Sequence, residues 1–320
     1  MNILDNVPDF LGVDWVKALE EHKVMFKNPN PVQFPRVYQL ETTSKCNLDC
    51  VFCPRQFMTR PKMNMPNKLF AKIVERDLKH TKALELFGFG DPLCDNMLEA
   101  RVDLLHAYSK YVVMATNALL AGKHSDELFK KVDYMILDID AVDAVNYERL
   151  RVGGKYEQML ENTQRIFEIR QKAKKYTVAQ FINYDSTEKQ RELFKEMYRD
   201  KCDELNIKFL DTFGGQVNKE YAKEQRGVKC MEPFYGLTIW SNGDVVMCDR
   251  DIHSTNRLGN VNDQSLQEIW EGTTAKWTQE CHKESRGENI ALCRNCKEWS
   301  LTNLRNVPEM TVNMFKGGFV

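Results

Sequence analysis

Three cysteines in one short stretch constrain this chain more than any other feature of its sequence. Cys46, Cys50 and Cys53 are separated by three and by two residues, and they directly follow a strand-like run. Three thiolates on one loop cannot complete a tetrahedral zinc site without a fourth ligand. They can bind three irons of a 4Fe-4S cluster, whose iron sites normally each take one cysteine. The loop therefore indicates a cluster with one iron open to a small molecule. A fragment of a zinc or structural cluster site is the alternative.

The same loop, with the aromatic Phe52 directly before the third cysteine, resembles the signature loop of the radical SAM superfamily. The resemblance implies that Cys46, Cys50 and Cys53 hold a catalytic 4Fe-4S cluster whose open iron chelates S-adenosylmethionine. It also implies that an electron from the cluster cleaves this molecule to methionine and a 5′-deoxyadenosyl radical, which abstracts a substrate hydrogen. Phe52 is expected against adenine or as a shield of the cluster, with simple core packing as the alternative.

From Arg36 onward, alternating strand-like and helix-like segments predict an α/β fold. The six predicted strands are Arg36–Ser44, Ala83–Phe87, Tyr111–Thr116, Tyr134–Ile139, Tyr176–Asn183 and Leu205–Leu210. Repeated β/α units imply a parallel sheet with right-handed crossovers. Because six units are fewer than the eight of a closed barrel, we expect a partial (β/α)6 TIM-like barrel.

After Gly214 and Gly215 the pattern changes to a smaller unit. Two apolar runs flank Asn242-Gly243, a strong signal for a two-residue hairpin turn. A short helix with Leu266 on its apolar face follows. The predicted regions are an N-terminal helical extension at 1–35 with a helix at Asp14–Phe26, the barrel at 36–215, a small C-terminal β-hairpin/helix domain at 216–305 and a tail at 306–320.

A second set of cysteines lies in this C-terminal unit and comprises Cys230, Cys248, Cys293 and Cys296. Four thiols complete either a zinc site or a fully ligated 4Fe-4S cluster. The surrounding region resembles the SPASM/twitch extension of radical SAM enzymes. Four ligands match the shorter twitch form with one auxiliary cluster, and the spacing resembles that of the aminocyclitol (2-deoxy-scyllo-inosamine) dehydrogenase type. The two cysteine sets support each other.

Further candidate residues follow the predicted strands, whose carboxyl ends form the site in barrels of this kind. Gly88, Phe89, Gly90 and Asp91 stand where the superfamily has its Gly-Gly-Glu-Pro motif, whose backbone pairs with the ammonium group of S-adenosylmethionine. Phe89 replaces a glycine and Asp91 replaces a glutamate, but Gly90 still permits close approach. By itself, a glycine-rich turn after a strand is usually only a tight connection.

Other cofactor-binding candidates follow the third and fourth strands. Thr116 and Asn117 resemble the family's Thr-Asn-Gly loop, although Ala118 replaces the glycine. Asp138 and Arg151 correspond to the segment that contacts the ribose and carboxylate of S-adenosylmethionine, with a solvated or capping aspartate and a surface arginine as the alternatives. A carboxylate that accepts from ribose hydroxyls is chemically reasonable, as in dinucleotide sites.

Three polar residues on predicted strands are weaker candidates to bind substrate. Gln39, Glu41 and Gln180 occupy positions that can point into the barrel, where polar groups are expensive unless paired. A buried structural hydrogen bond is the equal alternative for each of them.

Charge and composition narrow the classes of partner and compartment. Forty-five basic and 46 acidic residues give a formal charge of −1, which predicts neither nucleic acid nor a membrane as a partner. We expect a cytoplasmic protein, because no export signal is recognisable and no apolar run approaches the ~18 residues of a spanning helix. Ten cysteines then indicate reduced thiols and metal ligands. The cysteines outside both sets, read most simply as small buried hydrophobes, are Cys94, Cys202 and Cys281.

Together these features predict a radical SAM oxidoreductase that dehydrogenates a small polar metabolite, with the auxiliary cluster as electron acceptor. An external electron donor such as flavodoxin or ferredoxin would supply the catalytic cluster. Peptide modification and epimerisation remain open, and in an epimerase Cys94 or Cys281 would donate a hydrogen atom. A zinc or iron-sulfur binding module without S-adenosylmethionine chemistry is the alternative from another class.

Overall fold

The computed structural model of the protein describes residues 31–183, 189–218, 230 and 232–296. The predicted helix at Asp14–Phe26 and the predicted tail at 306–320 lie outside these residues. None of the described helices has the length and apolar character needed to cross a lipid bilayer.

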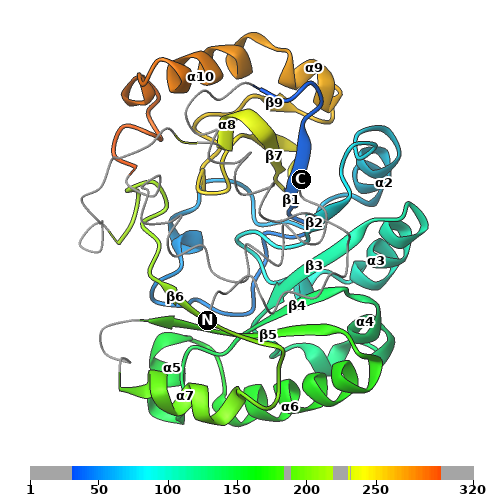
Figure 1. Ribbon diagram of the computed structural model, residues 1–320, viewed down its shortest axis with the longest axis vertical. Helices are drawn as coiled ribbons and strands as arrows, with labels where there is room; N and C mark the ends of the chain where they lie inside the picture. Colours follow the sequence, from blue (N-terminus) through cyan, green and yellow to red (C-terminus); the bar gives the residue numbers. More distant parts are fainter. Residues whose placement is uncertain (1–30, 184–188, 219–229, 231, 297–320) are drawn as a thin grey trace, which may run out of the picture.

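A single sheet of nine strands runs through the described chain (Figure 1), in the order β6-β5-β4-β3-β2-β1-β7-β8-β9. The strands are β1 (Arg36–Leu40), β2 (Ala83–Glu85), β3 (Tyr111–Thr116), β4 (Tyr134–Asp138), β5 (Tyr176–Asn183), β6 (Glu204–Phe209), β7 (Gly236–Ile239), β8 (Asp244–Val246) and β9 (Gly259–Asn260). Strands β1 to β6 are parallel neighbours in chain order. β6 does not pair back to β1, so the predicted open, partial barrel is confirmed.

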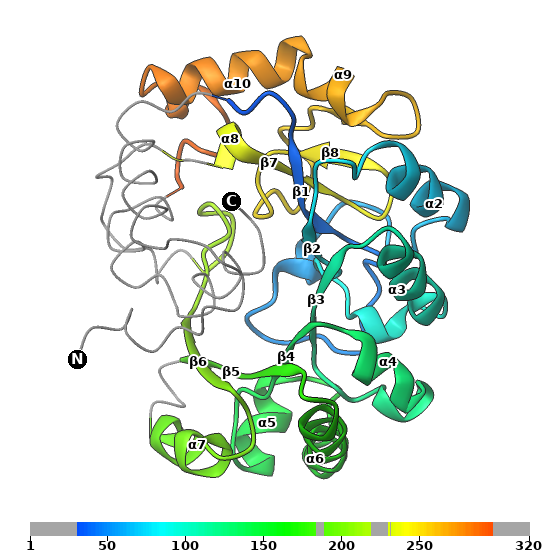
Figure 2. The same cartoon turned by 45° about the vertical axis from the view of Figure 1, so that its right-hand side comes forward.

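Helices cover the outer side of these six strands in both views (Figures 1 and 2). The barrel helices are α2 (Asn67–Arg76), α3 (Leu98–Ala107), α4 (Asp126–Lys131), α5 (Ala144–Leu150), α6 (Tyr156–Ala173) and α7 (Gln190–Tyr198). Alternate strand residues such as Val112, Met114 and Leu137 belong to the main core with these helices. Their neighbours, among them Val113 and Ile136, form a separate cluster on the inner face, as the two-residue strand period requires.

The C-terminal hairpin belongs to the same sheet as the barrel. β7 pairs in parallel with β1, with an irregularity between Val37 and Gln39, and β8 pairs antiparallel with β7. The hairpin is as predicted, but its turn is longer than two residues. Trp240 N–H donates to the carbonyl of Asp244 at 2.9 Å, and Gly243 adopts a left-handed φ of +88°. This is the three-residue form, in which a left-handed residue ends the loop.

The remaining helices pack beside this hairpin at one end of the molecule (Figure 2). They are α8 (Glu232–Tyr235), α9 (Leu266–Trp270) and α10 (Thr273–Lys283). The sequence pattern predicted α9 but neither α10 nor α5. α10 buries Thr278, Gln279 and His282 on its inner side, so it lacks the apolar period by which a helix is recognised.

One large apolar side chain of α7 lies at the surface. The side chain of Leu193 on α7 is 52% exposed, whereas Phe194 and Tyr198 are buried. Residues four apart share a helix face, so Phe194 and Tyr198 direct one face inward. Leu193 lies at the border of that face.

Candidate active site and auxiliary metal centre

The cysteine loop is held in place by the segment that follows α5. Asp49 N–H donates to the carbonyl of Val152 and Val51 N–H to that of Leu150, both at 3.0 Å. These bonds join residues about a hundred positions apart in the chain. The loop that carries all three thiols is therefore fixed between β1 and the end of α5.

Burial disfavours the thiolate form of these cysteines. It raises the pKa of Cys46 to about 12 and that of Cys50 to about 11, and it also raises the pKa of Cys53. The guanidinium of Arg151 opposes the shift at Cys50, because its Nη1 donates to Cys50 Sγ at 3.7 Å. Cysteines bind iron as thiolates. The positive charge of bound iron would stabilise the three buried thiolates, which burial alone disfavours. The donor set fits a 4Fe-4S cluster.

The glycine loop after β2 packs directly on the backbone that leads into the cysteines. A Cβ on Gly90 would lie 2.2 Å from the carbonyl oxygen of Thr43 and 2.6 Å from that of Lys45. A Cβ on Gly88 would lie 2.5 Å from the carboxylate of Glu41. Both glycines are therefore required by close approach, as the sequence predicted for Gly90.

Phe89, which replaces a family glycine, has a packing role toward the C-terminal unit. Its ring lies 5.2 Å from that of Trp240 and 5.8 Å from that of Phe213. It also belongs to a small buried cluster with Met58 and Ile252. The phenyl ring thus joins the glycine loop to the hairpin.

Asp91 fastens the glycine loop to the end of β3. Its carboxylate accepts from Thr116 Oγ1 at 3.0 Å, from Asn117 N–H at 2.8 Å and from Leu93 N–H at 2.9 Å. Asn117 Nδ2 in turn donates to Asn47 at 3.1 Å and lies 3.9 Å from Cys46 Sγ. The structure therefore brings the predicted residues of two different strands to the cysteine loop.

Arg151 is a buried cation at the centre of this region. It forms an ion pair with Asp140, whose own Oδ1 accepts from Ile182 N–H at 2.7 Å. Its guanidinium also lies 5.6 Å from the ring centre of Phe52, which is buried. The surface-arginine alternative is therefore wrong: the Arg151 side chain is buried and contacts both Cys50 and Phe52.

Asp138 and Gln180 belong to a chain of hydrogen bonds on the inner face. Gln180 Nε2 donates to Asp138 Oδ1 at 2.5 Å, and Asn206 Nδ2 donates to Gln180 Oε1 at 2.7 Å. Burial raises the pKa of Asp138 to about 6, although Arg151 opposes this shift. The side chains of Asp138 and Gln180 lie at the carboxyl ends of β4 and β5, where a barrel places its ligands.

Glu41 has the contacts of a structural residue. Its carboxylate is fully buried and pairs with Arg60 at 3.0 Å. It also accepts from Phe89 N–H at 3.0 Å and from Ser241 Oγ at 2.9 Å. Both oxygens are engaged by protein donors, so the geometry favours the structural alternative over substrate binding for Glu41.

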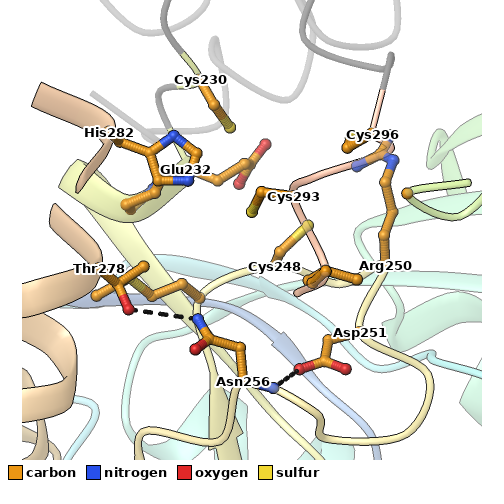
Figure 3. A pocket seen from close by; sticks show the side chains of 14 residues that line it. Cys230, Glu232, Cys248, Arg250, Asp251, Asn256, Thr278, His282, Cys293 and Cys296 are labelled. Carbon is orange, nitrogen blue, oxygen red and sulfur yellow. Dashed lines mark hydrogen bonds between the residues drawn. The ribbon is translucent and has the colours of Figure 1, made fainter. Parts of the chain in front are cut away.

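The four C-terminal cysteines line one cavity (Figure 3), in which Cys230, Cys248 and Cys293 surround a shared space. Its empty space is roughly 500 Å³, its open mouth included. Burial raises the pKa of Cys293 to about 12 and that of Cys230 well above its ordinary value. As in the first set, these thiols need a cationic partner to ionise. Cys296 completes a donor set that fits a fully ligated cluster.

No group of three or more His, Cys, Asp or Glu side chains within the described residues is placed to hold a metal ion. In a 4Fe-4S cluster, by contrast, the thiolates bind separate irons. The ligand roles of the cysteines therefore rest on their shared lining and sequence spacing, and they form part of the proposed function.

Several polar residues near these sites were missed by sequence reasoning. On the inner face they are Glu85, Asn206 and Lys208, and beside the auxiliary cavity they are Glu232 and His282. For the first three the signal was present: each lies two residues from another inward-facing position on its strand. His282 carried no signal, because its helix was not predicted.

The cysteines outside both sets have different surroundings. Cys94 lies 3.8 Å from Asn47 in the catalytic loop. Cys281 is fully buried and packs with Cys248 and Cys293. Cys202 donates to the carbonyl of Glu204 at 3.1 Å, away from both sets.

Comparison with known families matches both halves of this arrangement. The Radical SAM superfamily matches residues 40–197, and the SPASM iron-sulfur cluster-binding domain matches residues 230–297. The chain belongs to the radical SAM superfamily. Its first match implies a 4Fe-4S cluster and S-adenosylmethionine as cofactors, and its second implies further iron-sulfur.

Curated relatives of this radical SAM protein are distant. A probable GTP 3′,8-cyclase of Methanococcus maripaludis (strain DSM 14266) is 24% identical over 139 residues, which cover 42% of this chain and 46% of the relative. The chain thus matches less than half of that relative's length. An S-adenosyl-L-methionine-dependent 2-deoxy-scyllo-inosamine dehydrogenase of Niallia circulans is 20% identical over 269 residues, covering 82% of this chain and 93% of the relative.

Solved structures share the fold at low identity. BtrN in complex with AdoMet and 2-DOIA has a TM-score of 0.58 at 16% identity, covering 84% of this chain and 95% of BtrN. Streptococcus suis SuiB bound to precursor peptide SuiA has a TM-score of 0.64 at 16% identity, covering 94% and 80%. One of these structures holds a small molecule and the other a peptide, so the shared fold does not select a substrate class.

Proposed function

We propose that this radical SAM enzyme dehydrogenates a small polar metabolite, such as an aminocyclitol or a sugar, and that an auxiliary 4Fe-4S cluster accepts an electron from the substrate. The observation that carries the proposal is the cavity lined by Cys230, Cys248, Cys293 and Cys296. A complete set of four thiols leaves no open iron, so this site suits electron transfer better than ligand binding.

The catalytic cluster would be held by Cys46, Cys50 and Cys53. When bound, the cofactors would supply a 5′-deoxyadenosyl radical that removes a hydrogen atom from a substrate carbon, and the auxiliary cluster would accept one electron as the proton of the hydroxyl or amine on that carbon leaves to solvent. The protein supplies binding, orientation and electrostatics. In this proposal the backbone of 88–90 binds the ammonium group of S-adenosylmethionine, and Asp91 holds that backbone against Asn117.

Arg151 and Asp138 have distinct tasks in this proposal. The guanidinium of Arg151 stabilises negative charge at Cys50 and orients the carboxylate of S-adenosylmethionine. Asp138 accepts from ribose hydroxyls, and Gln180 holds its carboxylate in place at 2.5 Å. Phe52, which packs under Arg151, limits the access of water to the same region.

The two cysteine sets are joined by a rigid connection. β1 leads directly into the catalytic loop, and β7, which pairs with β1, leads through the hairpin to Cys248. Strands paired in one sheet keep a fixed separation, so a substrate on the inner face would meet both clusters in a constant geometry. This arrangement supports the proposed oxidation, because that reaction needs both clusters near the substrate.

The alternatives within the superfamily make different products. A peptide-modifying enzyme would act on a peptide, and SuiB, which shares the fold, has its structure solved with the precursor peptide SuiA bound. An epimerase would return a hydrogen to the substrate radical, and Cys94 or Cys281 would be the donor. Cys281 is fully buried within a cluster that includes two of the auxiliary cysteines, which disfavours it in that role.

The test uses protein purified under argon, reduced with dithionite and supplied with S-adenosylmethionine and 2-deoxy-scyllo-inosamine. The proposal expects 5′-deoxyadenosine and dehydrogenated product in equal amounts, with no deuterium taken up from heavy water. Cys248→Ala should keep cleavage of S-adenosylmethionine but lose the product. Cys202→Ala, a cysteine outside both sets, should keep both.

Three outcomes would contradict the proposal. Deuterium at an inverted carbon would indicate epimerisation, and turnover restricted to peptides would indicate peptide modification. Stoichiometric zinc without cleavage of S-adenosylmethionine would indicate a binding module instead of an enzyme.

A further inference from the structure

The inner face of the barrel divides into an apolar and a polar part. Val113, Tyr134, Ile136 and Val178 form a buried apolar cluster on this face. The polar residues of the same face lie around and above them and include Gln39, Glu85, Asp138, Gln180, Asn206 and Lys208. The apolar residues lie toward the amino ends of their strands, so the polar residues lie toward the carboxyl ends, where barrels of this kind hold their ligands.

Glu85 is the residue of this face whose charge is least compensated. The residues before and after it in the chain, Leu84 and Leu86, belong to the core that the helices cover. Because side chains alternate along a strand, Glu85 points to the inner face of the barrel. Among the described residues, no donor forms a hydrogen bond or ion pair with its carboxylate. Burial, together with the negative charges of Asp249 and Glu232, raises its pKa to about 8, although Lys208 opposes the shift.

Gln39 supplies an independent observation beside it. Gln39 and Glu85 are register partners on the neighbouring strands β1 and β2, so their side chains lie side by side on the same face. The side chain of Gln39 is only 5% exposed, and its Oε1 is buried with no hydrogen-bond donor in the described chain. A buried acceptor without a donor is costly to maintain. The missing donor would come from a ligand.

The charges around Glu85 define what kind of ligand would be attracted. Three carboxylates, those of Glu85, Glu232 and Asp249, lie within Coulombic range of one another. The cations nearby are Lys208, which also acts on Asp138, and Arg250, which pairs with Asp249 at 2.9 Å. Lys208 is exposed, so its attraction for Glu85 is weakened by solvent. Negative charge is therefore in excess.

Glu85 interacts electrostatically with groups that lie beside each of the two cysteine sets. Glu232 lines the auxiliary cavity, and Asp249 directly follows Cys248. On the other side, Lys208 lies within range of Asp138, which in turn interacts with Arg151 beside Cys50. A substrate bound at Glu85 would therefore lie near residues of both cysteine sets, as the proposed oxidation requires.

We infer that Glu85 and Gln39 form a binding site for the ammonium group of an amine-bearing, polyhydroxylated substrate. The ammonium would donate to the Glu85 carboxylate and to Gln39 Oε1, and hydroxyl groups would reach Gln180 and Asn206, which are hydrogen-bonded to each other. This inference rests on the proposed function, since it takes the substrate to lie in the barrel. Two residues of adjacent strands would then select amine-bearing substrates over neutral ones.

The test compares two probes on the cluster-loaded protein with S-adenosylmethionine present. One probe is 2-deoxy-scyllo-inosamine, which carries an ammonium group, and the other is scyllo-inositol, a neutral ring of the same size. Isothermal titration calorimetry at pH 8.5, above the raised pKa of Glu85 and below that of an ordinary alkylammonium group, should give at least about tenfold tighter binding of the amine, the range of a hydrogen bond to a charged group. Glu85→Gln should remove this preference.

Two further variants separate binding from folding. Glu75→Gln makes the same substitution at an exposed position of α2 and should keep the preference for the amine. Gln39→Leu removes the unpaired acceptor without touching the charge, and it should weaken amine binding while leaving the weak binding of scyllo-inositol unchanged. Iron content and the thermal midpoint of each variant report whether it has folded. If Glu85→Gln does not fold, Glu85→Asp replaces it, and it should reduce the preference without abolishing it.

Equal affinity of the wild type for both probes, or no binding of either, would overturn the inference, as would a preference that survives Glu85→Gln. Cleavage of S-adenosylmethionine after dithionite reduction is measured alongside. If cleavage occurs and the amine preference is absent, this inference alone fails. If the preference depends on Glu85 but no cleavage occurs, the proposed function alone fails.

Discussion

Replacing Glu41 by glutamine should destabilise the protein by about 3–5 kcal/mol, the usual cost of breaking a buried ion pair on one side. The side chains of Glu41 and Arg60 are 0% and 2% exposed, and their two hydrogen bonds measure 3.0 and 3.3 Å. The same carboxylate accepts from Phe89 and Ser241. A glutamine amide can accept at only one end, so whichever way it is turned, its NH2 group meets another donor.

The expected shift in thermal midpoint follows from chain length. Unfolding entropy near 2.1 cal/mol/K per residue, taken over 320 residues, gives roughly 0.7 kcal/mol/K, so the midpoint should fall by about 4–7 °C. Differential scanning calorimetry of wild type and variant at one scan rate measures the shift. Glu127→Gln is the matched control, because the Glu127–Lys130 pair is exposed and its loss should cost less than about 1 kcal/mol.

A double substitution tests the origin of the effect. Glu41→Met combined with Arg60→Met removes both charges, so it should cost clearly less than the two single changes added together. If Glu41→Gln lowers the midpoint no more than Glu127→Gln does, Glu41 is not the structural anchor described above. Its assignment to substrate binding would then have to be restored.

Three other substitutions probe the site. Gly90→Ala should cost about 1–3 kcal/mol or more and lower the iron content of the catalytic site, because the three atoms nearest to its Cβ would all be backbone atoms, of Thr43, Ser44 and Lys45; Gly122→Ala, with open space around it, should leave iron content unchanged. Arg151→Gln removes the cation 3.7 Å from Cys50 Sγ and should make the catalytic cluster harder to reduce, which a potentiometric EPR titration without S-adenosylmethionine would measure as a more negative midpoint; an unchanged midpoint would rule out this influence. The pKa of the Glu85 carboxyl is raised from 4.5 to about 8 in the folded protein. Folding therefore favours the protonated carboxyl, and the free energy of unfolding falls as the pH rises from about 4.5 to about 8. The thermal midpoint of the wild type should therefore fall more between pH 5 and pH 8 than that of Glu85→Gln, and parallel pH curves would contradict the shift.

The fold was largely predictable because its signals are local. β3 and β5 begin and end at the predicted residues, and the other barrel strands differ by a few residues at their ends. Each strand alternates between core-facing and inward-facing side chains, a pattern that the strand period of two makes legible without any tertiary information. The helices that the sequence did not predict, α5 and α10, are the ones with short or polar buried faces.

The site was predictable in part. The cysteine spacing indicated two candidate metal sites, and the structure joins Asp91 to Thr116 and Asn117, three of the residues that the resemblance proposed for cofactor binding. The role of Phe89 was hidden, because the ring that it packs against, Trp240, lies far along the chain. Glu85 was not singled out either: the strand period places it on the inner face, but a three-residue strand does not show which charges surround it there.

The amino-acid sequence alone determined the chemistry of the cysteine loop, because eight consecutive residues place three thiols within reach of one cluster whatever the rest of the chain does. Only the tertiary structure decided which carboxylates are occupied by protein donors, as Glu41 is, and which have no such donor among the described residues, as is the case for Glu85. Glu41 meets Ser241 across 200 positions, and Glu85 meets Gln39 across a strand pair. Such contacts depend on sheet register and on which partner arrives at each face, and these are properties of the assembled sheet rather than of any segment within it.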